Sequence, residues 1–122
     1  MKKLINKVVD DIKKIGKVNA VFLFGSHATG TNKPYSDIDI CVVAEGLTEE
    51  ERIEILTNSS EKLDVSLFSD LSLLIQYRVL KDGKVLFNRD WLKLHRMKVK
   101  TVTEYLDFKH LLDRHVEYTL NS

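Results

Sequence analysis

Two apolar strands joined by a Gly-Ser turn, the second opening on paired acids, constrain this fold most. The run from Val18 to Phe24 is apolar apart from Asn19 and leads into Gly25-Ser26. A second apolar run, Ile38 to Val43, contains Asp39 and follows Asp37. Side chains alternate along an extended strand, so Asp37 and Asp39 should point to one side, roughly 6–7 Å apart at their Cα atoms. Carboxylates at that spacing can share hard divalent cations such as Mg²⁺. The segment predicts a strand pair with a cation site at one end.

Gly25 and Ser26 add the features of a phosphate site. A Gly-Ser turn after a strand supplies exposed backbone amides, a hydroxyl group and a helix N-terminus, all of which suit a phosphate. Glycine also lets the backbone come close to a bound group. A cation site beside a phosphate site indicates nucleotide chemistry.

The spacing Gly-Ser, ten residues, Asp-x-Asp resembles the nucleotidyltransferase superfamily related to DNA polymerase beta. Within it, the pattern is most similar to the minimal (MntA-like) nucleotidyltransferases, which often act as the antitoxin of a HEPN-domain protein. The resemblance spans residues 1 to about 90, and the matching positions are Gly25, Ser26, Ala28, Gly30, Ser36, Asp37 and Asp39. It implies an α/β (α+β) fold in which helices flank a small mixed sheet.

The same resemblance implies a site and a reaction. Asp37 and Asp39 would hold one or two Mg²⁺ ions, and a third carboxylate comes from a later strand, a place that Asp64 matches. Asp64 would also position or deprotonate an attacking hydroxyl. Ser26 would hydrogen-bond a terminal phosphate of ATP, and Gly25 would let the backbone come close to that phosphate. The implied reaction is transfer of AMP to a hydroxyl acceptor, most simply a tyrosine or another hydroxyl of a HEPN toxin.

The loop after Gly-Ser departs from the pattern of many relatives. It carries His27 and Thr29 where relatives have arginines, so binding of the triphosphate is expected to be weaker or pH-sensitive, because histidine is only partly charged near neutral pH. Lys33 at the loop tip could compensate as a nucleotide-binding cation, and a solvated lysine is the alternative. Tyr35 could stack on a base or be an ordinary loop tyrosine.

The remaining elements follow from periodicity and capping signals. We expect a helix near residues 2–15, a second from a Thr48–Glu51 capping box to about Asn58, and a third capped by Ser69 or Asp70. The third should end at Asp82-Gly83. Strands are expected over Leu63 to Phe68 and Lys84 to Asn88, and Asp90 should cap a helix that runs almost to the end of the sequence.

That last helix predicts an extension from a single domain of residues 1–122, with a core of about 1–90 and a helical extension of about 90–120. About 30 helical residues span about 45 Å, whereas a domain of this size is about 35 Å across. Either the helix therefore bends near Lys100-Thr101, or one end protrudes. A protruding end would carry Tyr105, Phe108, Leu112 and Val116 and would favour a homo- or hetero-oligomer. The alternative is that these residues close the domain's own core.

Charge and composition limit the classes of partner and the cell compartment that suit this chain. A net charge of +1 makes nucleic acid an unlikely partner, and the chain has no apolar run long enough to cross a membrane and no signal-peptide pattern. The one cysteine, Cys41, suits a reducing cytoplasm and reads as a core residue.

Three functions remain open at this point. The first is an enzyme that adenylylates a HEPN toxin and silences it. The second is an antitoxin that neutralises the toxin by binding alone, which the long last helix and the missing loop arginines favour. The third is a nucleotidyltransferase for a small molecule or an RNA end, although such enzymes usually have a second, substrate-binding domain.

Overall fold

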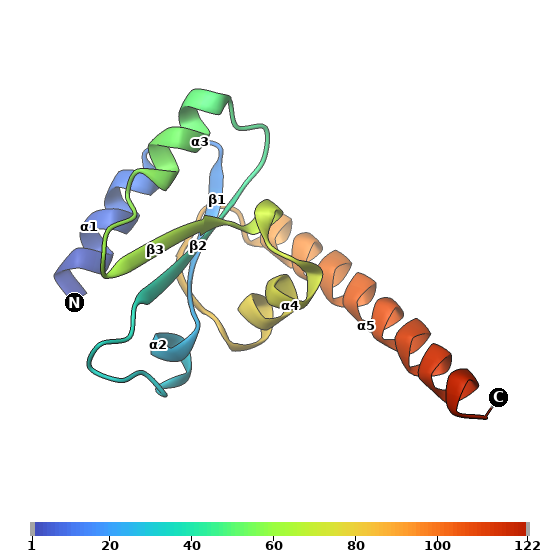
Figure 1. Cartoon of the computed structure of the whole chain (residues 1–122). Coiled ribbons are helices and arrows are strands. Elements are labelled where there is room, and N and C mark those ends of the chain that lie inside the picture. The colour runs from blue at the N-terminus through green and yellow to red at the C-terminus, as the bar shows by residue number, and fades with distance from the viewer. Residues whose placement is uncertain (1, 122) are drawn as a thin grey trace.

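A four-stranded mixed sheet forms the centre of the molecule, which is described by a computed structural model for residues 2–121 (Figure 1). Strands β1 (Val18–Phe24) and β2 (Ile38–Ala44) form a central antiparallel pair. Strand β4 (Lys84–Asn88) joins β1 antiparallel, and β3 (Leu63–Leu67) joins β2 parallel, which gives the order β3-β2-β1-β4. The α/β class and the mixed sheet expected from the sequence are confirmed.

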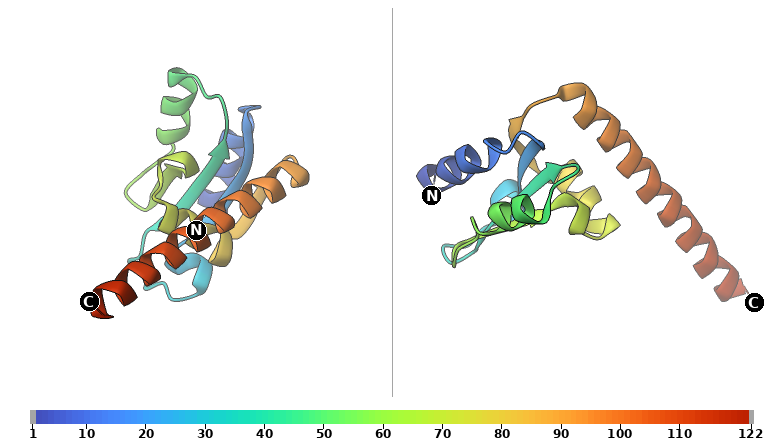
Figure 2. Two further views of the ribbon diagram at one scale, coloured as in Figure 1. Left: turned by 90° about the vertical axis from the view of Figure 1, so that its right-hand side faces the viewer. Right: turned by 90° about the horizontal axis from the view of Figure 1, so that it is seen from above.

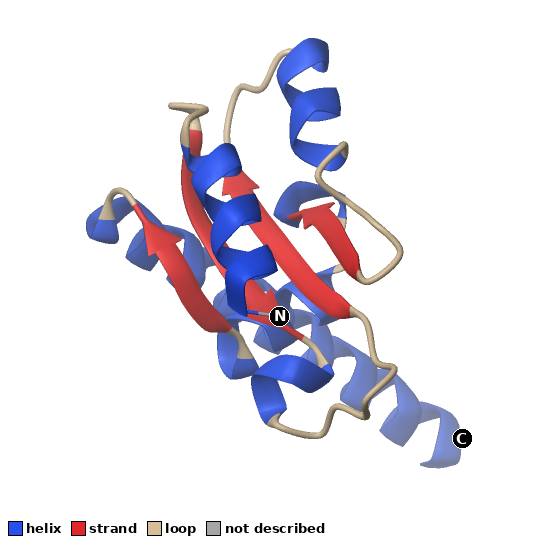
Figure 3. Ribbon diagram, turned by 90° about the vertical axis from the view of Figure 1, so that its left-hand side faces the viewer, coloured by secondary structure: helices blue, strands red, loops and turns tan. Residues whose placement is uncertain are grey.

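Helices cover both faces of this sheet (Figures 2 and 3). Helices α1 (Lys2–Lys13) and α3 (Glu49–Leu56) pack on one face, whereas α4 (Leu73–Asp82) and the first part of α5 (Trp91–Asn121) pack on the other. The one-turn helix α2 (Ser26–Thr29) follows β1, and a short 3₁₀ turn, η1 (Phe68–Asp70), follows β3.

Alternation along the strands divides the core into two layers. Ile12 of α1 and Ile55 of α3 are fully buried against Ile40 on one face. Phe22 and Cys41 face the other side, where they pack with residues of α4 and α5. Cys41 has no exposed surface, and burial raises the pKa of its thiol to about 12. The expectation that Cys41 is a core residue is confirmed.

Local signals predicted some helix ends correctly and others not. The capping box forms as expected, with the Glu51 N–H donating to Thr48 Oγ1 at 3.2 Å and the Thr48 N–H donating to Glu51 Oε1 at 2.9 Å. The first helix ends at Lys13, two residues earlier than expected. Strand β3 ends at Leu67, one residue before the expected end.

The cap expected at Ser69 or Asp70 is wrong. Helix α4 is capped by Ser72, whose hydroxyl accepts from the Ile75 N–H at 3.4 Å. Ser69 and Asp70 lie in η1, and the Asp70 carboxylate pairs with Arg52 at 2.6 Å. Asp70 is therefore drawn toward α3.

Helix α4 ends at Gly83, as expected, but Gly83 does not adopt the left-handed conformation usual for a glycine that ends a helix. Its φ is −71° and its backbone is extended. A Cβ at this position would collide with the carbonyl oxygen of Val79 and press on that of Leu23 in β1. Glycine is required chiefly because a side chain would collide with the last turn of α4 itself, and the end of β1 adds a second, looser restriction.

Helix α5 leaves the domain. Of the two alternatives left open by the sequence, protrusion holds for Phe108, Leu112 and Val116, whereas Tyr105 packs on the domain. Its 31 residues correspond to about 46 Å. Leu94 and Thr101 are buried, and Tyr105 stacks on Tyr77 of α4 with ring centroids 4.0 Å apart. From Leu106 to Glu117 every side chain is exposed, and Figures 1 and 2 show this half of α5 projecting away from the sheet. Among residues 2–121, no helix is long and apolar enough to cross a membrane.

Candidate functional site

The register of the sheet brings two predicted carboxylates together. Asp39 in β2 is the direct parallel partner of Asp64 in β3, and on its other side it pairs with Phe24, the last residue of β1. Asp37 lies two residues before Asp39, outside the strand. The three acidic residues therefore lie at the end of the sheet where β1 ends and where β2 and β3 begin.

Burial and neighbouring charges perturb Asp39. Its pKa is raised above the ordinary value, first by partial burial and then by the negative charges of Asp64 and Asp37, while His27 opposes the rise. Asp37 and Asp64 are exposed. The three acids thus form one electrostatic group in which ionisation of Asp39 is disfavoured.

Gly25 lies directly against this group. Its φ of +75° falls in the left-handed region that glycine tolerates, and a Cβ there would collide with the Asp39 carboxylate. Ser26 begins α2 immediately afterwards and is half-buried. Within residues 2–121 the Ser26 hydroxyl makes no hydrogen bond, which leaves it available to a bound group.

A hydrogen bond from His27 closes the loop that joins the Gly25 turn to Asp37 and Asp39. Its Nε2 lies 3.0 Å from the Ser36 carbonyl oxygen. A carbonyl can only accept, so Nε2 carries the hydrogen and donates it. Sequence reasoning treated His27 as a weak substitute for a phosphate-binding arginine, whereas the structure uses it to connect α2 to the residue before Asp37.

Lys33 is not brought to the carboxylates. It lies exposed in the loop, its backbone N–H donates to Ser36 Oγ at 2.9 Å, and its Nζ is 6.0 Å from the centroid of the Tyr35 ring. Lys33 makes no hydrogen bond or ion pair with Gly25, Ser26 or the three acids.

The acids have the chemistry of a Mg²⁺ site, because hard divalent cations prefer carboxylate oxygens and are often completed by substrate phosphates. Asp64 and Asp37 raise the pKa of Asp39, so a bound cation would stabilise the ionised form of this group of acids. In the part of the chain that the structure describes, no three His, Cys, Asp or Glu side chains are already gathered as a metal-ligand cluster.

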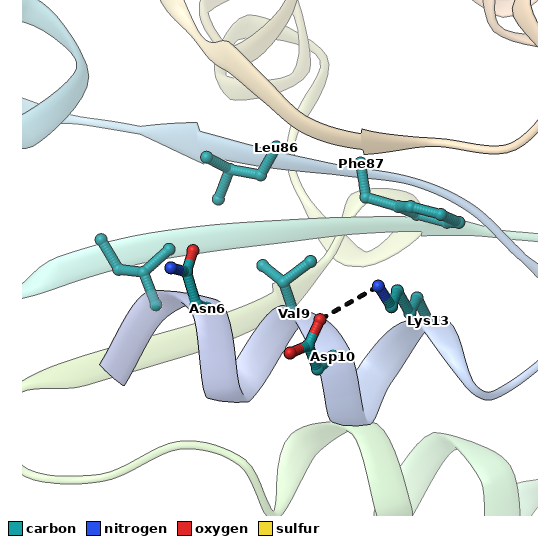
Figure 4. Close-up of a pocket in the computed structure, with 7 residues that line it drawn as sticks. Asn6, Val9, Asp10, Lys13, Leu86 and Phe87 are labelled. Atoms are coloured by element: carbon teal, nitrogen blue, oxygen red, sulfur yellow. Dashed lines mark ion pairs between the residues drawn. The ribbon is translucent and has the colours of Figure 1, made fainter. Parts of the chain in front are cut away.

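Two pockets need to be distinguished. One of about 350 Å³ lies between α1 and β4 on the opposite face of the sheet, where Asp10 pairs with Lys13 at 3.0 Å (Figure 4). None of the predicted site residues lines it. A second pocket of about 210 Å³ lies beside the Gly25 turn, and its lining consists of Phe24, Gly25, Thr29, Ile75, Arg78 and Asp82.

Sequence reasoning did not single out Arg78. Its position in α4 reads as a solvated helix face, and its place beside Gly25 depends on how α4 packs across β1. No local signal contains that information.

Sequence comparison gives the chain relatives with a related chemistry. It matches the family described as "Polymerase beta, Nucleotidyltransferase" over residues 6–91. It is 37% identical over 73 residues to a protein of Methanocaldococcus jannaschii that is named a putative protein adenylyltransferase. That match covers 60% of this chain and 58% of the relative.

Solved structures share the fold over almost the whole chain. A chain of a toxin–antitoxin crystal structure with AMP-PNP matches with a TM-score of 0.74 and 25% identity, over 97% of each chain. A chain of the tri-AMPylated Shewanella oneidensis HEPN toxin in complex with MNT antitoxin matches with a TM-score of 0.72 and 22% identity, over 98% of each chain. The spectinomycin adenyltransferase of Enterococcus matches more distantly, with a TM-score of 0.58 and 15% identity, over 76% of this chain and 58% of that one. The last two show similarity of fold alone.

Proposed function

Because this chain belongs to the polymerase beta nucleotidyltransferase family, we propose that it transfers AMP from ATP to a hydroxyl group of a HEPN toxin and thereby acts as its antitoxin. The observation that carries this proposal is the pairing of Asp39 with Asp64, next to Asp37 and against the Gly25 turn. The adenylyltransferase name of the Methanocaldococcus relative and the AMP-PNP in a toxin–antitoxin structure of the same fold support it.

Asp37, Asp39 and Asp64 are the residues that would hold Mg²⁺. When bound, Mg²⁺ neutralises charge on the triphosphate and on the leaving pyrophosphate. Gly25 lets the backbone approach the phosphates, and Ser26 offers its free hydroxyl as a donor. The acceptor oxygen forms a bond to the α-phosphorus as the bond from that phosphorus to pyrophosphate breaks. Asp64, the exposed member of the pair, takes the proton of the acceptor hydroxyl.

Helix α5 offers a surface for the protein acceptor. We define the α5 stripe as Phe108, Leu112 and Val116, which are 56%, 49% and 49% exposed. They continue, at helical spacing, the face on which Leu94 and Thr101 are buried against the domain. A partner seated on the stripe would extend the packing of α5 beyond the edge of the domain. We therefore place the toxin there.

The deciding experiment incubates the protein, alone and with the product of the neighbouring gene as the candidate toxin, with Mg²⁺ and α-labelled ATP. We expect label on the toxin with the wild-type chain and a loss of at least about a thousandfold with Asp39→Asn, because one metal-binding carboxylate is removed. Asp10→Asn, on the opposite face of the sheet, is the matched control and should label normally. Equal labelling by Asp39→Asn would contradict an active site at these carboxylates.

The second candidate, a non-catalytic antitoxin, is favoured by the contacts of the two loop residues expected to help bind the triphosphate. His27 is engaged by Ser36, and the Lys33 ammonium lies over the Tyr35 ring. The same experiment separates the two functions. A stable complex without any label, with toxin activity suppressed by Asp39→Asn as well as by wild type, would establish neutralisation by binding. Label on an added RNA or aminoglycoside and none on the toxin would establish the third alternative.

A further inference from the structure

The pocket beside the Gly25 turn contains a cation, the side chain of Arg78. Arg78 comes from α4 and lines this pocket with Gly25 and Thr29, while Phe24 and Ile75 form its apolar wall. Because Gly25 also touches the Asp39 carboxylate, the pocket adjoins the group of acids. A molecule that lies on the Gly25 turn therefore has Arg78 within the same pocket.

The Arg78 guanidinium is uncommitted, in contrast to the arginines that brace the fold. Arg52 pairs with Asp70 at 2.6 Å, and Arg89 donates to the carbonyl oxygens of Lys13 and Val18 at 2.6 and 3.0 Å. Arg78 is exposed and makes no ion pair or hydrogen bond within residues 2–121, even with Asp82, which lines the same pocket. An arginine without a structural task is free to bind an anion.

The backbone that carries Arg78 is nevertheless held firmly. Val79 and Leu80, the next two residues, are buried in the second core layer. Gly83 then packs the end of α4 against the carbonyl of Leu23, two residues before Gly25. The base of the Arg78 side chain is thus fixed relative to the turn.

We propose that Arg78 is the cation that binds the triphosphate of the nucleotide at the Gly25 turn. A guanidinium presents a planar fork of donors that matches phosphate oxygens bidentately, which suits an anion lying on that turn. The inference rests on the proposed function, and it explains how a loop with His27 engaged and Lys33 at its tip can still serve a triphosphate. The carboxylates would act on one side of the nucleotide and Arg78 on the other.

The test measures the Kd of AMP-PNP with Mg²⁺ by calorimetry for wild type, Arg78→Ala and Arg78→Lys. Loss of charge-assisted hydrogen bonds should weaken AMP-PNP binding by about 10- to 100-fold in Arg78→Ala. Arg78→Lys should recover part of the affinity, since it keeps the charge and loses the fork. Lys81→Ala is the matched control, because it removes an exposed cation from the same helix without touching the pocket.

Competition by inorganic tripolyphosphate identifies what Arg78 contacts. If it binds the phosphates, Arg78→Ala should weaken tripolyphosphate and AMP-PNP alike, with an unchanged melting temperature. A variant that loses AMP-PNP only would place Arg78 on the nucleoside and overturn the proposal, as would wild-type affinity in Arg78→Ala. Failure of the wild-type chain itself to bind AMP-PNP would instead contradict the proposed function, and this inference with it.

Discussion

At the scale of single residues, Asp39 combines a stability cost with the proposed chemistry. Partial burial, Asp64 and Asp37 all disfavour its ionised form, so its pKa is raised in the folded state. A carboxyl whose folded pKa exceeds its unfolded pKa stabilises the fold when it is protonated, and this contribution is lost as pH rises through the folded pKa. When Asp39 is ionised, the folded chain therefore carries an unfavourable charge that a bound cation would offset.

Replacing that charge should stabilise the protein. We expect Asp39→Asn to raise the melting temperature at pH 7 by about 2–4 °C in the absence of divalent cations. The side chain is only partly buried, so solvent screening keeps the gain below about 1 kcal/mol. The difference should shrink as pH falls toward the acidic range, where Asp39 itself is protonated. Melting curves of both proteins between pH 4 and pH 8 check this, and an Asp39→Asn variant that melts lower at pH 7 would contradict the electrostatic account.

Local spacing was enough to name most of the candidate site. The Gly-Ser turn, Asp37 and Asp39 are close in sequence, and Asp64 was matched to a third carboxylate through the family resemblance. That Asp64 lies beside Asp39 depends on the pairing of β3 with β2, and strand order cannot be read from local spacing. Their roles in binding and chemistry stay predictions. Arg78 and the hydrogen bond of His27 depend on contacts across the fold, which no local pattern encodes.

At the scale of elements, the short helix α2 and the loop to β2 form one unit because His27 ties them together. The Ser36 N–H also donates to the Lys33 carbonyl at 3.0 Å, which closes the end of the loop into a turn before Asp37. The loop thus holds the Gly25 turn at a set distance from the start of β2.

This tie can be tested by keeping or removing the donor. His27→Gln places an amide N–H near the position of Nε2, whereas His27→Leu keeps bulk without a donor. We expect His27→Leu to lower the free energy of unfolding by about 1 kcal/mol and kcat/KM for ATP by about tenfold, and His27→Gln to restore most of both. Urea unfolding and steady-state kinetics measure the two effects. Equal losses in both variants would indicate that the imidazole itself, and not its hydrogen bond, is needed.

Elements were predictable where the signal was self-contained. The Thr48 capping box involves residues three apart and forms as expected. The start of α4 was mispredicted because Ser69, Asp70 and Ser72 are all competent caps in sequence. The choice among them depends on Asp70 pairing with Arg52 of a different helix, which is a tertiary contact.

At the scale of the whole molecule, α5 divides the protein into a packed domain and a projecting arm (Figure 2). The inner half of α5 closes the second core layer through Leu94. The outer half carries the α5 stripe, which the proposed function assigns to the toxin. Recognition of the partner and chemistry at the carboxylates should therefore be separable.

A charged side chain introduced into the α5 stripe should abolish binding of the toxin without affecting binding of the nucleotide. We expect Leu112→Glu to abolish co-purification with the toxin and to reduce its labelling by at least about tenfold, because burying an unpaired carboxylate in an apolar interface is costly. The Kd of AMP-PNP should not change. His110→Glu introduces a similar charge on the other side of the same helix and should leave the complex intact. A complex that survives Leu112→Glu would show that the toxin docks elsewhere.

The burial of Cys41 makes the alkylation rate of its thiol a measure of how often the sheet opens. Its thiol lies on the same strand as Asp39 and two residues further along, sealed between the sheet and the helices above it. An alkylating reagent attacks the thiolate, so it can reach this sulfur only while the sheet is open. The alkylation rate of the thiol therefore reports how often β2, the strand that carries Asp39, becomes exposed. A bound nucleotide that holds β2 in the closed sheet would lower this rate.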